Sequence, residues 1–146
     1  MLAKGIVMRI KRTDCVGIVC IRGDEVLLIQ RGTAPRKGEW SIPGGRIETG
    51  ETEAQAALRE LEEETNVTAD LLTKITALNA DFEGYHYRLH DYLARWVSGD
   101  PKAGDDADKA CFVPLSKIDG LGMWTETVRV IREGHAKMVL FSQDAP

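Results

Sequence analysis

The chain has 146 residues, with 19 basic and 23 acidic side chains and a formal net charge of −4. That length fits one domain over residues 1–146, and 43% apolar with 29% charged residues is typical of a folded globular protein. The negative charge argues against binding to a nucleic-acid duplex or an anionic membrane. No run approaches the roughly 20 apolar residues of a membrane span.

We therefore expect a cytoplasmic protein with no membrane partner, and a homodimer is left open as its assembly state. The opening segment supports this expectation. Lys4, Arg9 and Lys11 interrupt its apolar stretches, which is unlike a secretory leader.

The N-terminal part of the chain predicts β-structure. Residues 15–22 and 26–31 are rich in β-branched side chains, and Gly23-Asp24-Glu25 between them predicts a hairpin turn. Residues 32–39 are rich in turn formers and should be exposed. Residues 40–45 predict a short strand.

A helix is predicted from Glu53 to Thr65. Thr52 and Gln55 have the spacing of a capping box, and Asn66 tolerates the left-handed conformation that ends many helices. The later elements follow in order: extended segments at 70–82 and 86–98, a loop at 99–108, a strand at 109–115, a helix at 125–134 ended by Gly134, and a short strand at 138–141.

The predicted helix carries acidic side chains on one face. At 100° per residue, Glu60, Glu63 and Glu64 share an arc of about 100°. Like charges at these spacings repel, and only Arg59 is near enough to offset them. A divalent cation with oxygen ligands would neutralise the cluster, although acidic runs are also common on solvated helix faces.

A separate stripe on this helix is predicted to pack on a sheet. It consists of Ala54, Leu58, Leu61 and Thr65. Ala56 and Ala57 are expected beside the acids. Glu48 and Glu51 precede the helix and add two carboxylates at its start.

The segment from Gly44 to Val67 resembles the Nudix hydrolase signature, G-x5-E-x7-R-E-U-x-E-E-x-G-U, where U is a bulky apolar residue. The matching positions are Gly45, Glu51, Arg59, Glu60, Leu61, Glu63, Glu64 and Val67. Asn66 replaces the last glycine, and it can adopt the same left-handed backbone at small cost.

The resemblance implies an α+β fold, an α/β/α sandwich in which a mixed β-sheet lies between helices and a loop–helix–loop forms the catalytic unit. It also implies hydrolysis of the pyrophosphate bond in a nucleoside diphosphate linked to another moiety. Glu60, Glu63, Glu64 and the Gly45 carbonyl would bind Mg²⁺ or Mn²⁺. Glu51 would pair with Arg59 and hold the loop against the helix.

Further site residues are expected outside the signature. Asp106, in an acidic loop before a strand, is a candidate general base, and a solvated turn is the alternative. Trp40 and Tyr87 are candidates for stacking on a base, and Arg31 and Arg46 for contacting phosphate. We expect Trp124 to pack in the core, and His86 and His90 to be ordinary sheet residues.

The sequence does not choose between an ADP-ribose-like and a nucleoside-triphosphate substrate. Two other classes of function stay open. One is a nucleotide-sensing module without catalysis, which the intact acidic set argues against. The other is an acidic helix that docks a basic protein, which the small Ala56 and Ala57 side chains make a poor anchor.

Overall fold

The structure is a computed structural model that describes residues 9–104 and 106–143. Lys4, on which part of the leader expectation rests, lies outside the described residues. The strands are β1 (Thr13–Arg22), β2 (Glu25–Arg31), β3 (Trp40–Ser41), β4 (Gly44–Arg46), β5 (Thr68–Phe82), β6 (Tyr85–Ser98) and β7 (Ala107–Pro114). The helices are α1 (Glu53–Thr65), the 3-10 helix η1 (Leu115–Leu121) and α2 (Thr125–Gln143).

The strands form one mixed sheet. Its order is β3-β2-β1-β6-β5, with β4 paired to β1 and β7 paired to β2. β1 runs parallel to β6 along one edge, and every other pairing is antiparallel. The other edge of β1 is shared, because β4 pairs with Cys15–Gly17 and β2 pairs with Ile21 and Arg22.

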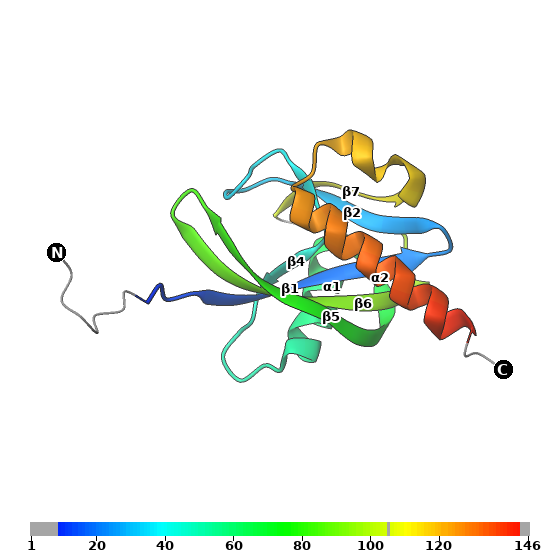
Figure 1. The fold of residues 1–146 in the computed structure, drawn as a ribbon, viewed down its shortest axis with the longest axis horizontal. Coiled ribbons are helices and arrows are strands. Elements are labelled where there is room, and N and C mark those ends of the chain that lie inside the picture. The colour runs from blue at the N-terminus through cyan, green and yellow to red at the C-terminus, as the bar shows by residue number, and fades with distance from the viewer. Residues whose placement is uncertain (1–8, 105, 144–146) are drawn as a thin grey trace.

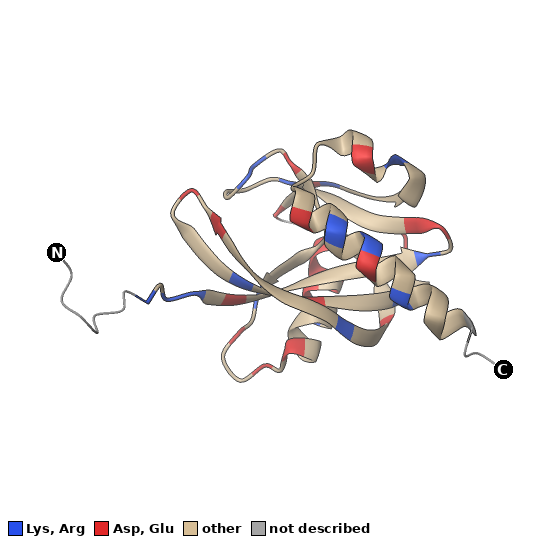
Figure 2. Cartoon of the chain, viewed as in Figure 1, with Lys and Arg blue, Asp and Glu red and all other residues tan. Residues whose placement is uncertain are grey.

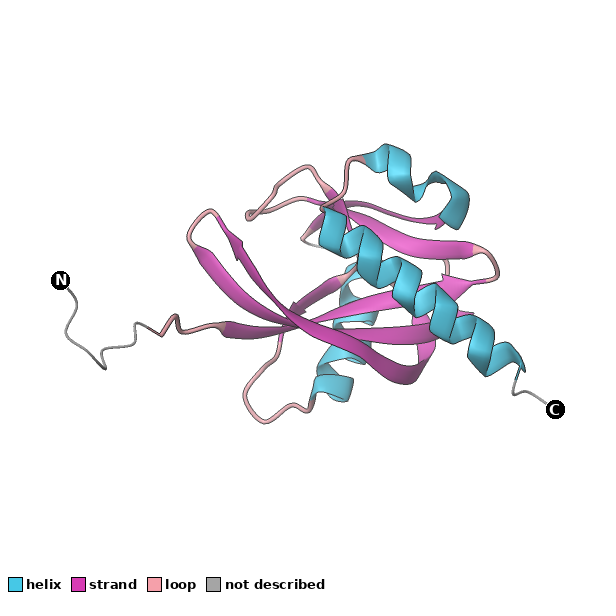
Figure 3. Ribbon diagram, in the orientation of Figure 1, coloured by secondary structure: helices cyan, strands magenta, loops and turns pink. Residues whose placement is uncertain are grey.

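Alternating side chains of β1 give the sheet two apolar faces. Val19 and Ile21 pack in one cluster with residues of α2, whereas Ile18 and Cys20 pack in a second cluster with residues of α1. Figure 1 accordingly shows α2 across the front of the sheet and α1 behind it, and Figure 3 shows the helix–sheet–helix layering. The predicted α+β sandwich is confirmed.

The helix predicted from Glu53 to Thr65 is present with both expected ends. Thr52 Oγ1 accepts from the Gln55 backbone N–H at 3.1 Å, and the Thr52 N–H donates to Gln55 Oε1 at 2.9 Å. Asn66 ends the helix at φ 63°. These local signals placed the helix correctly.

The face that α1 buries differs from the predicted stripe. Ala54 is exposed and Leu58 is 40% exposed, whereas Ala56 and Ala57 are fully buried against the sheet. Two alanines allow the helix backbone to approach the sheet closely. Compared with the predicted orientation, α1 is turned about its axis so that Glu64 also faces the sheet, where it is only 8% exposed.

The C-terminal helix is longer than predicted. α2 continues through Gly134 to Gln143, so the expected stop at Gly134 and the short strand at 138–141 are wrong. A Cβ on Gly134 would lie 3.0 Å from Ile75 Cδ1 and 3.0 Å from Val19 Cγ1. Gly134 therefore permits close packing of α2 on the sheet and does not end the helix.

We expect Gly134→Leu to lower the free energy of unfolding by about 1–3 kcal/mol, because a bulky side chain would overpack this contact. Urea denaturation of the purified protein measures the change. Ala136→Leu, at an exposed position of the same helix, is the matched control and should be nearly neutral. Equal stability of the two variants would contradict the close-packing role of Gly134.

The strand predicted at 40–45 is two short strands with different partners. β3 pairs with β2, and β4 pairs with β1. Pro43 between them has no N–H to donate to a ladder, and its carbonyl accepts from the Ile18 N–H at 2.9 Å.

In the described part of the chain, none of the helices has the length and apolar character needed to cross a bilayer.

Candidate active site

A cavity of about 460 Å³ is lined by residues of the sheet, α1, α2, the loop at 32–39 and Asp106. Eight of the predicted site residues line it: Arg31, Trp40, Gly45, Arg46, Glu60, Glu64, Tyr87 and Asp106. Glu51, Arg59 and Glu63 lie outside its lining, on the outer side of α1. The structure thus brings most of the predicted residues to one hollow and leaves three beside it.

Glu64 is the most deeply buried acid of α1. Its side chain is 8% exposed, and Oε2 accepts from the Gly44 backbone N–H at 2.9 Å. The pKa of Glu64 is raised to about 7. Burial is the main cause, the nearby Glu60 charge adds to it, and the hydrogen bond from Gly44 opposes it. A positive charge in the cavity would therefore stabilise the ionised carboxylate.

The Glu60 carboxylate lies directly over Gly45. A Cβ on Gly45 would overlap the carboxylate, which explains in physical terms why glycine stands at this position. Burial raises the pKa of Glu60, the Arg59 hydrogen bond opposes that shift, and the charges of Glu63 and Asp106 add to it.

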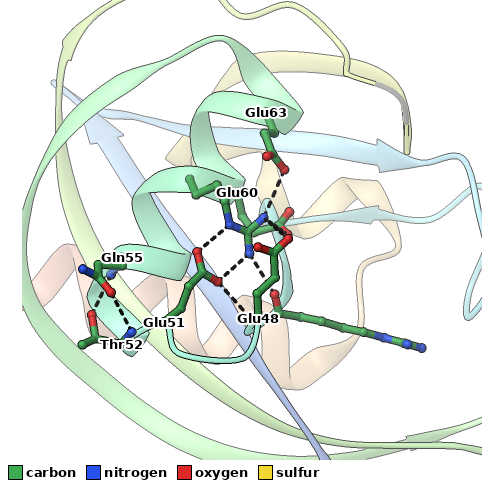
Figure 4. A network of polar contacts seen from close by, with 8 residues as sticks. Glu48, Glu51, Thr52, Gln55, Glu60 and Glu63 are labelled. Atoms are coloured by element: carbon green, nitrogen blue, oxygen red, sulfur yellow. Dashed lines mark hydrogen bonds and ion pairs between the residues drawn. The ribbon is translucent and has the colours of Figure 1, made fainter.

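Arg59 is the centre of a polar network at the start of α1 (Figure 4). It donates to Glu51 from Nε at 2.6 Å and from Nη2 at 2.8 Å, and Nη2 also reaches the Arg46 carbonyl at 3.1 Å. Nη1 donates to Glu60 at 2.9 Å and to Glu63 at 3.1 Å. The bidentate pair with Glu51 ties the preceding loop to the helix, and it lowers the pKa of Glu51 to about 2.

The charge distribution matches this arrangement. Figure 2 shows acidic residues along the loop before α1 and on α1 itself, whereas α2 alternates both signs. Glu48 adds a fourth carboxylate near Arg59, at 3.7 Å. One guanidinium is thus shared among four acids, so the local charge stays negative.

The residues of the predicted metal site fit a hard cation in chemistry. Within residues 9–104 and 106–143, no three His, Cys, Asp or Glu side chains converge as a ready metal cluster, because Glu63 is turned outward to Arg59. Glu60, which is half-buried, and Glu64, which is buried, nevertheless line the cavity with raised pKa values. Carboxylates of this kind are ligands for Mg²⁺ or Mn²⁺, and Glu63 joins them if it exchanges its exposed ion pair for a metal.

Asp106 lines the cavity near the acids of α1. Its backbone carbonyl accepts from the Gly32 N–H at 3.1 Å, which anchors the acidic loop to the end of β2. Its charge contributes to the raised pKa values of Glu60 and Glu64. Arg31, whose Nε donates to the Pro35 carbonyl at 2.6 Å, lines the same cavity and lowers the pKa of Glu64.

Aromatic side chains also line the cavity. The rings of Tyr85 and Tyr87 lie 5.8 Å apart, and the Tyr87 hydroxyl raises the pKa of Arg46. Phe82 and Trp124 meet edge to face at 4.8 Å. Trp124 is half-buried and lines the cavity, so its predicted place in the core is wrong: its ring packs against Phe82 and lies under the Arg36 guanidinium.

His86 and His90 of β6 lie outside the cavity lining. His86 contacts Asp81 at 2.7 Å, and His90 contacts Asp14 at 2.9 Å. His90 also lies 3.4 Å from Glu53 of α1, so its contacts extend beyond the sheet.

Three acidic cavity residues did not emerge from the sequence. Glu39, Asp91 and Glu126 line the hollow. A signal for Asp91 was present, because it takes an inward position in the alternation of Tyr87, Leu89 and Leu93 on β6. Glu126, in the first turn of α2, carried no comparable signal.

Comparisons with known proteins agree with this geometry. The family model for the NUDIX domain matches residues 11–133, and the chain belongs to this family. It is 33% identical over 110 residues to an ADP-ribose pyrophosphatase of Methanocaldococcus jannaschii, covering 73% of this chain and 64% of that protein. It is 32% identical over 107 residues to an 8-oxo-dGTP diphosphatase of Escherichia coli, covering 71% of this chain and 83% of that protein.

A solved structure shows the same fold. A MutT NUDIX hydrolase from Burkholderia pseudomallei superposes with a TM-score of 0.76 at 24% identity, covering 84% of this chain and 98% of that one. Curated relatives differ in length, and the chain spans 31% of a mouse 8-oxo-dGDP phosphatase. The activities in these names are those of the named proteins.

Proposed function

We propose that this chain hydrolyses the pyrophosphate bond of a nucleoside diphosphate linked to another moiety, with Mg²⁺ or Mn²⁺ as its cofactor. The observation that carries the proposal is one cavity with three kinds of lining. The carboxylates of Glu60 and Glu64, the guanidinium groups of Arg31 and Arg46, and several aromatic side chains all line it. These match a cation, phosphates and a base respectively.

Glu60, Glu63, Glu64 and the Gly45 carbonyl would hold the metal. A divalent cation there supplies charge neutralisation on the phosphates and lowers the pKa of bound water. The cation also accounts for binding of a polyanion by a protein of charge −4. Arg59 remains tied to Glu51 and keeps the loop in register with the helix.

The remaining roles belong to side chains across the cavity. Asp106 accepts the proton of the attacking water, Arg31 and Arg46 contact phosphate oxygens, and Trp40 and Tyr87 contact the base. The location of each on the cavity lining supports its role.

The test is phosphate release from a panel of nucleotides, including ADP-ribose and nucleoside triphosphates, with and without Mg²⁺. Metal-dependent release from at least one compound is expected, together with calorimetric uptake of Mg²⁺ or Mn²⁺ at millimolar concentration. Tight binding of the panel without release would instead indicate a sensing module. If the protein neither bound any nucleotide of the panel nor took up metal, the proposal would be contradicted and protein docking by α1 would be favoured.

Substrate choice, a single domain over residues 1–146, a cytoplasmic location and a homodimer remain predictions. The relatives named above act on different nucleotides, so they do not select among the substrates. Size-exclusion chromatography with light scattering tests the assembly state.

A further inference from the structure

His90 lies in a line of polar contacts that reaches from the sheet to the start of α1. Its Nε2 lies 2.9 Å from Asp14 Oδ1 of β1, and its Nδ1 lies 2.9 Å from Lys74 Nζ of β5. Lys74 Nζ in turn donates at 2.8 Å to Oε1 of Glu53, the first residue of α1. One side chain from each of four elements thus forms a continuous set of contacts, which we call the anchoring network: Asp14, His90, Lys74 and Glu53.

Lys74 fixes the direction of the hydrogen bonds in this network. An ammonium group only donates, so the Nδ1 atom of His90 accepts from Lys74. In a neutral ring Nε2 then carries the proton and donates to Asp14. The hydrogen bond from Lys74 is also the main cause of a lowered pKa of Glu53. Each donor of the network is therefore matched with an acceptor when Glu53 is ionised.

Glu53 is held from β6 as well. The Tyr92 hydroxyl donates to Glu53 Oε1 at 2.7 Å, and it keeps its proton because burial and the Glu53 carboxylate raise its pKa to about 12. Among the residues that the structure describes, Glu53 makes the only side-chain hydrogen bonds between α1 and the strands β5 and β6. One side chain therefore ties the start of the helix to these two strands.

Asp14 also fixes the other end of the loop that precedes α1. Its carbonyl accepts from the Ile47 N–H at 3.1 Å, and Ile47 directly follows β4. The loop at 47–52 is thus held at its first residue by the Asp14 backbone and just beyond its last residue by Glu53. The proposed metal ligands stand on both sides of this loop, with the Gly45 carbonyl before it and Glu60, Glu63 and Glu64 after it.

We propose that Glu53, Lys74 and His90 are positioning residues for the hydrolysis, which set where α1 presents its carboxylates relative to the Gly45 carbonyl. The inference rests on the proposed function. Glu60 lies about 10 Å along the helix axis from Glu53, so a tilt at the start of the helix displaces the carboxylates farther along it. A displacement of about 1 Å far from the reacting atoms can lower a rate greatly.

The experiment is a double-mutant cycle on Glu53→Ala and Lys74→Met, with kcat, KM and the Mg²⁺ concentration for half-maximal rate as its readouts. Each single variant should lower kcat by at least about fivefold and raise the Mg²⁺ requirement. KM for the nucleotide at saturating Mg²⁺ should change little, because neither residue lines the cavity. The double variant should be little worse than either single one, because both changes break the same contact. Effects that multiply, or a rise in KM alone, would overturn the inference.

Two further variants separate positioning from folding. Glu53→Gln keeps an oxygen that accepts from Lys74 and Tyr92, so it should recover part of the activity that Glu53→Ala loses. Glu62→Ala removes an exposed carboxylate of the same helix and should keep kcat within about twofold of the parent. No recovery in Glu53→Gln, or equal kcat in Glu53→Ala and Glu62→Ala, would contradict the positioning role.

The melting temperature should change little in these variants. The Glu53 and Lys74 side chains are 33% and 39% exposed, and ion pairs of that exposure add little to the free energy of unfolding. A large fall in melting temperature that accompanied the loss of activity would indicate a structural role and overturn the inference.

Hydrogen exchange of the α1 amides is a readout that needs no turnover. Glu53→Ala and Lys74→Met should each raise exchange at the start of α1 and leave α2 unchanged, and unchanged exchange in α1 would overturn the inference. If the parent hydrolyses nucleotides and both variants keep its kcat and Mg²⁺ requirement, the inference fails and the proposed function stands. If nothing in the panel is hydrolysed but both variants loosen α1, the proposed function fails and the anchoring of α1 stands.

Discussion

Replacing Glu63 with Gln is expected to lower kcat by at least about 100-fold and to leave the melting temperature almost unchanged. The side chain is 61% exposed, and its ion pair is with Arg59. The change therefore removes one negative ligand and no core packing. Arg59 keeps its hydrogen bonds to Glu51 and Glu60 in the variant.

The matched control is the neighbouring acid. Glu62 is exposed on the same helix, and no hydrogen bond or ion pair of its carboxylate occurs within the described residues. Glu62→Gln makes the same chemical change and should keep kcat within about twofold of the parent. Equal activity of the Glu63 and Glu62 variants would remove Glu63 from the proposed metal ligands.

Isotopic or calorimetric metal titration gives the same test without turnover. Glu63→Gln should weaken Mg²⁺ or Mn²⁺ uptake, because one carboxylate fewer offsets the cation. Glu62→Gln should not. This readout separates loss of a metal ligand from a disturbed substrate site.

Helix α1 was predictable because its signals are local. Thr52, Gln55 and Asn66 fix its ends through contacts within a few residues. The Glu51–Arg59 pair, which the resemblance to the Nudix family implied, spans eight residues and is present. Such short-range features depend little on the rest of the fold.

The remaining features depend on contacts between distant segments. Glycine is common at helix ends, so Gly134 predicted a stop. Only its close approach to Ile75 and Val19 shows why it lies inside α2. The sequence predicts a core position for Trp124, and only the three-dimensional arrangement places it in the cavity lining. The pairing of Gly17 with Asp91 likewise joins strands 74 residues apart along the chain, by the register of β1 with β6.

Glu51→Gln should lower activity by loosening the loop that joins β4, which carries Gly45 and Arg46, to α1. A neutral amide cannot hold the bidentate contact that Arg59 makes with the carboxylate. Without the Glu51 carboxylate, Arg59 is left with Glu60 and Glu63, to which it already donates, and it competes more strongly with the metal for these ligands. We expect a fall in kcat/KM and a higher Mg²⁺ concentration for half-maximal rate.

The same substitution predicts a pH-dependent change in stability. Arg59 lowers the folded-state pKa of Glu51 from 4.5 to about 2, so the pair stabilises the folded protein fully above pH 4.5 and loses that contribution as pH falls toward 2. The variant should melt below the parent at pH 7, and the gap should close between pH 4.5 and 2. Glu48→Gln, whose 66% exposed side chain lies 3.7 Å from Arg59, should show a smaller gap. A gap independent of pH would contradict the pairing, because only an ionised Glu51 can be stabilised by Arg59.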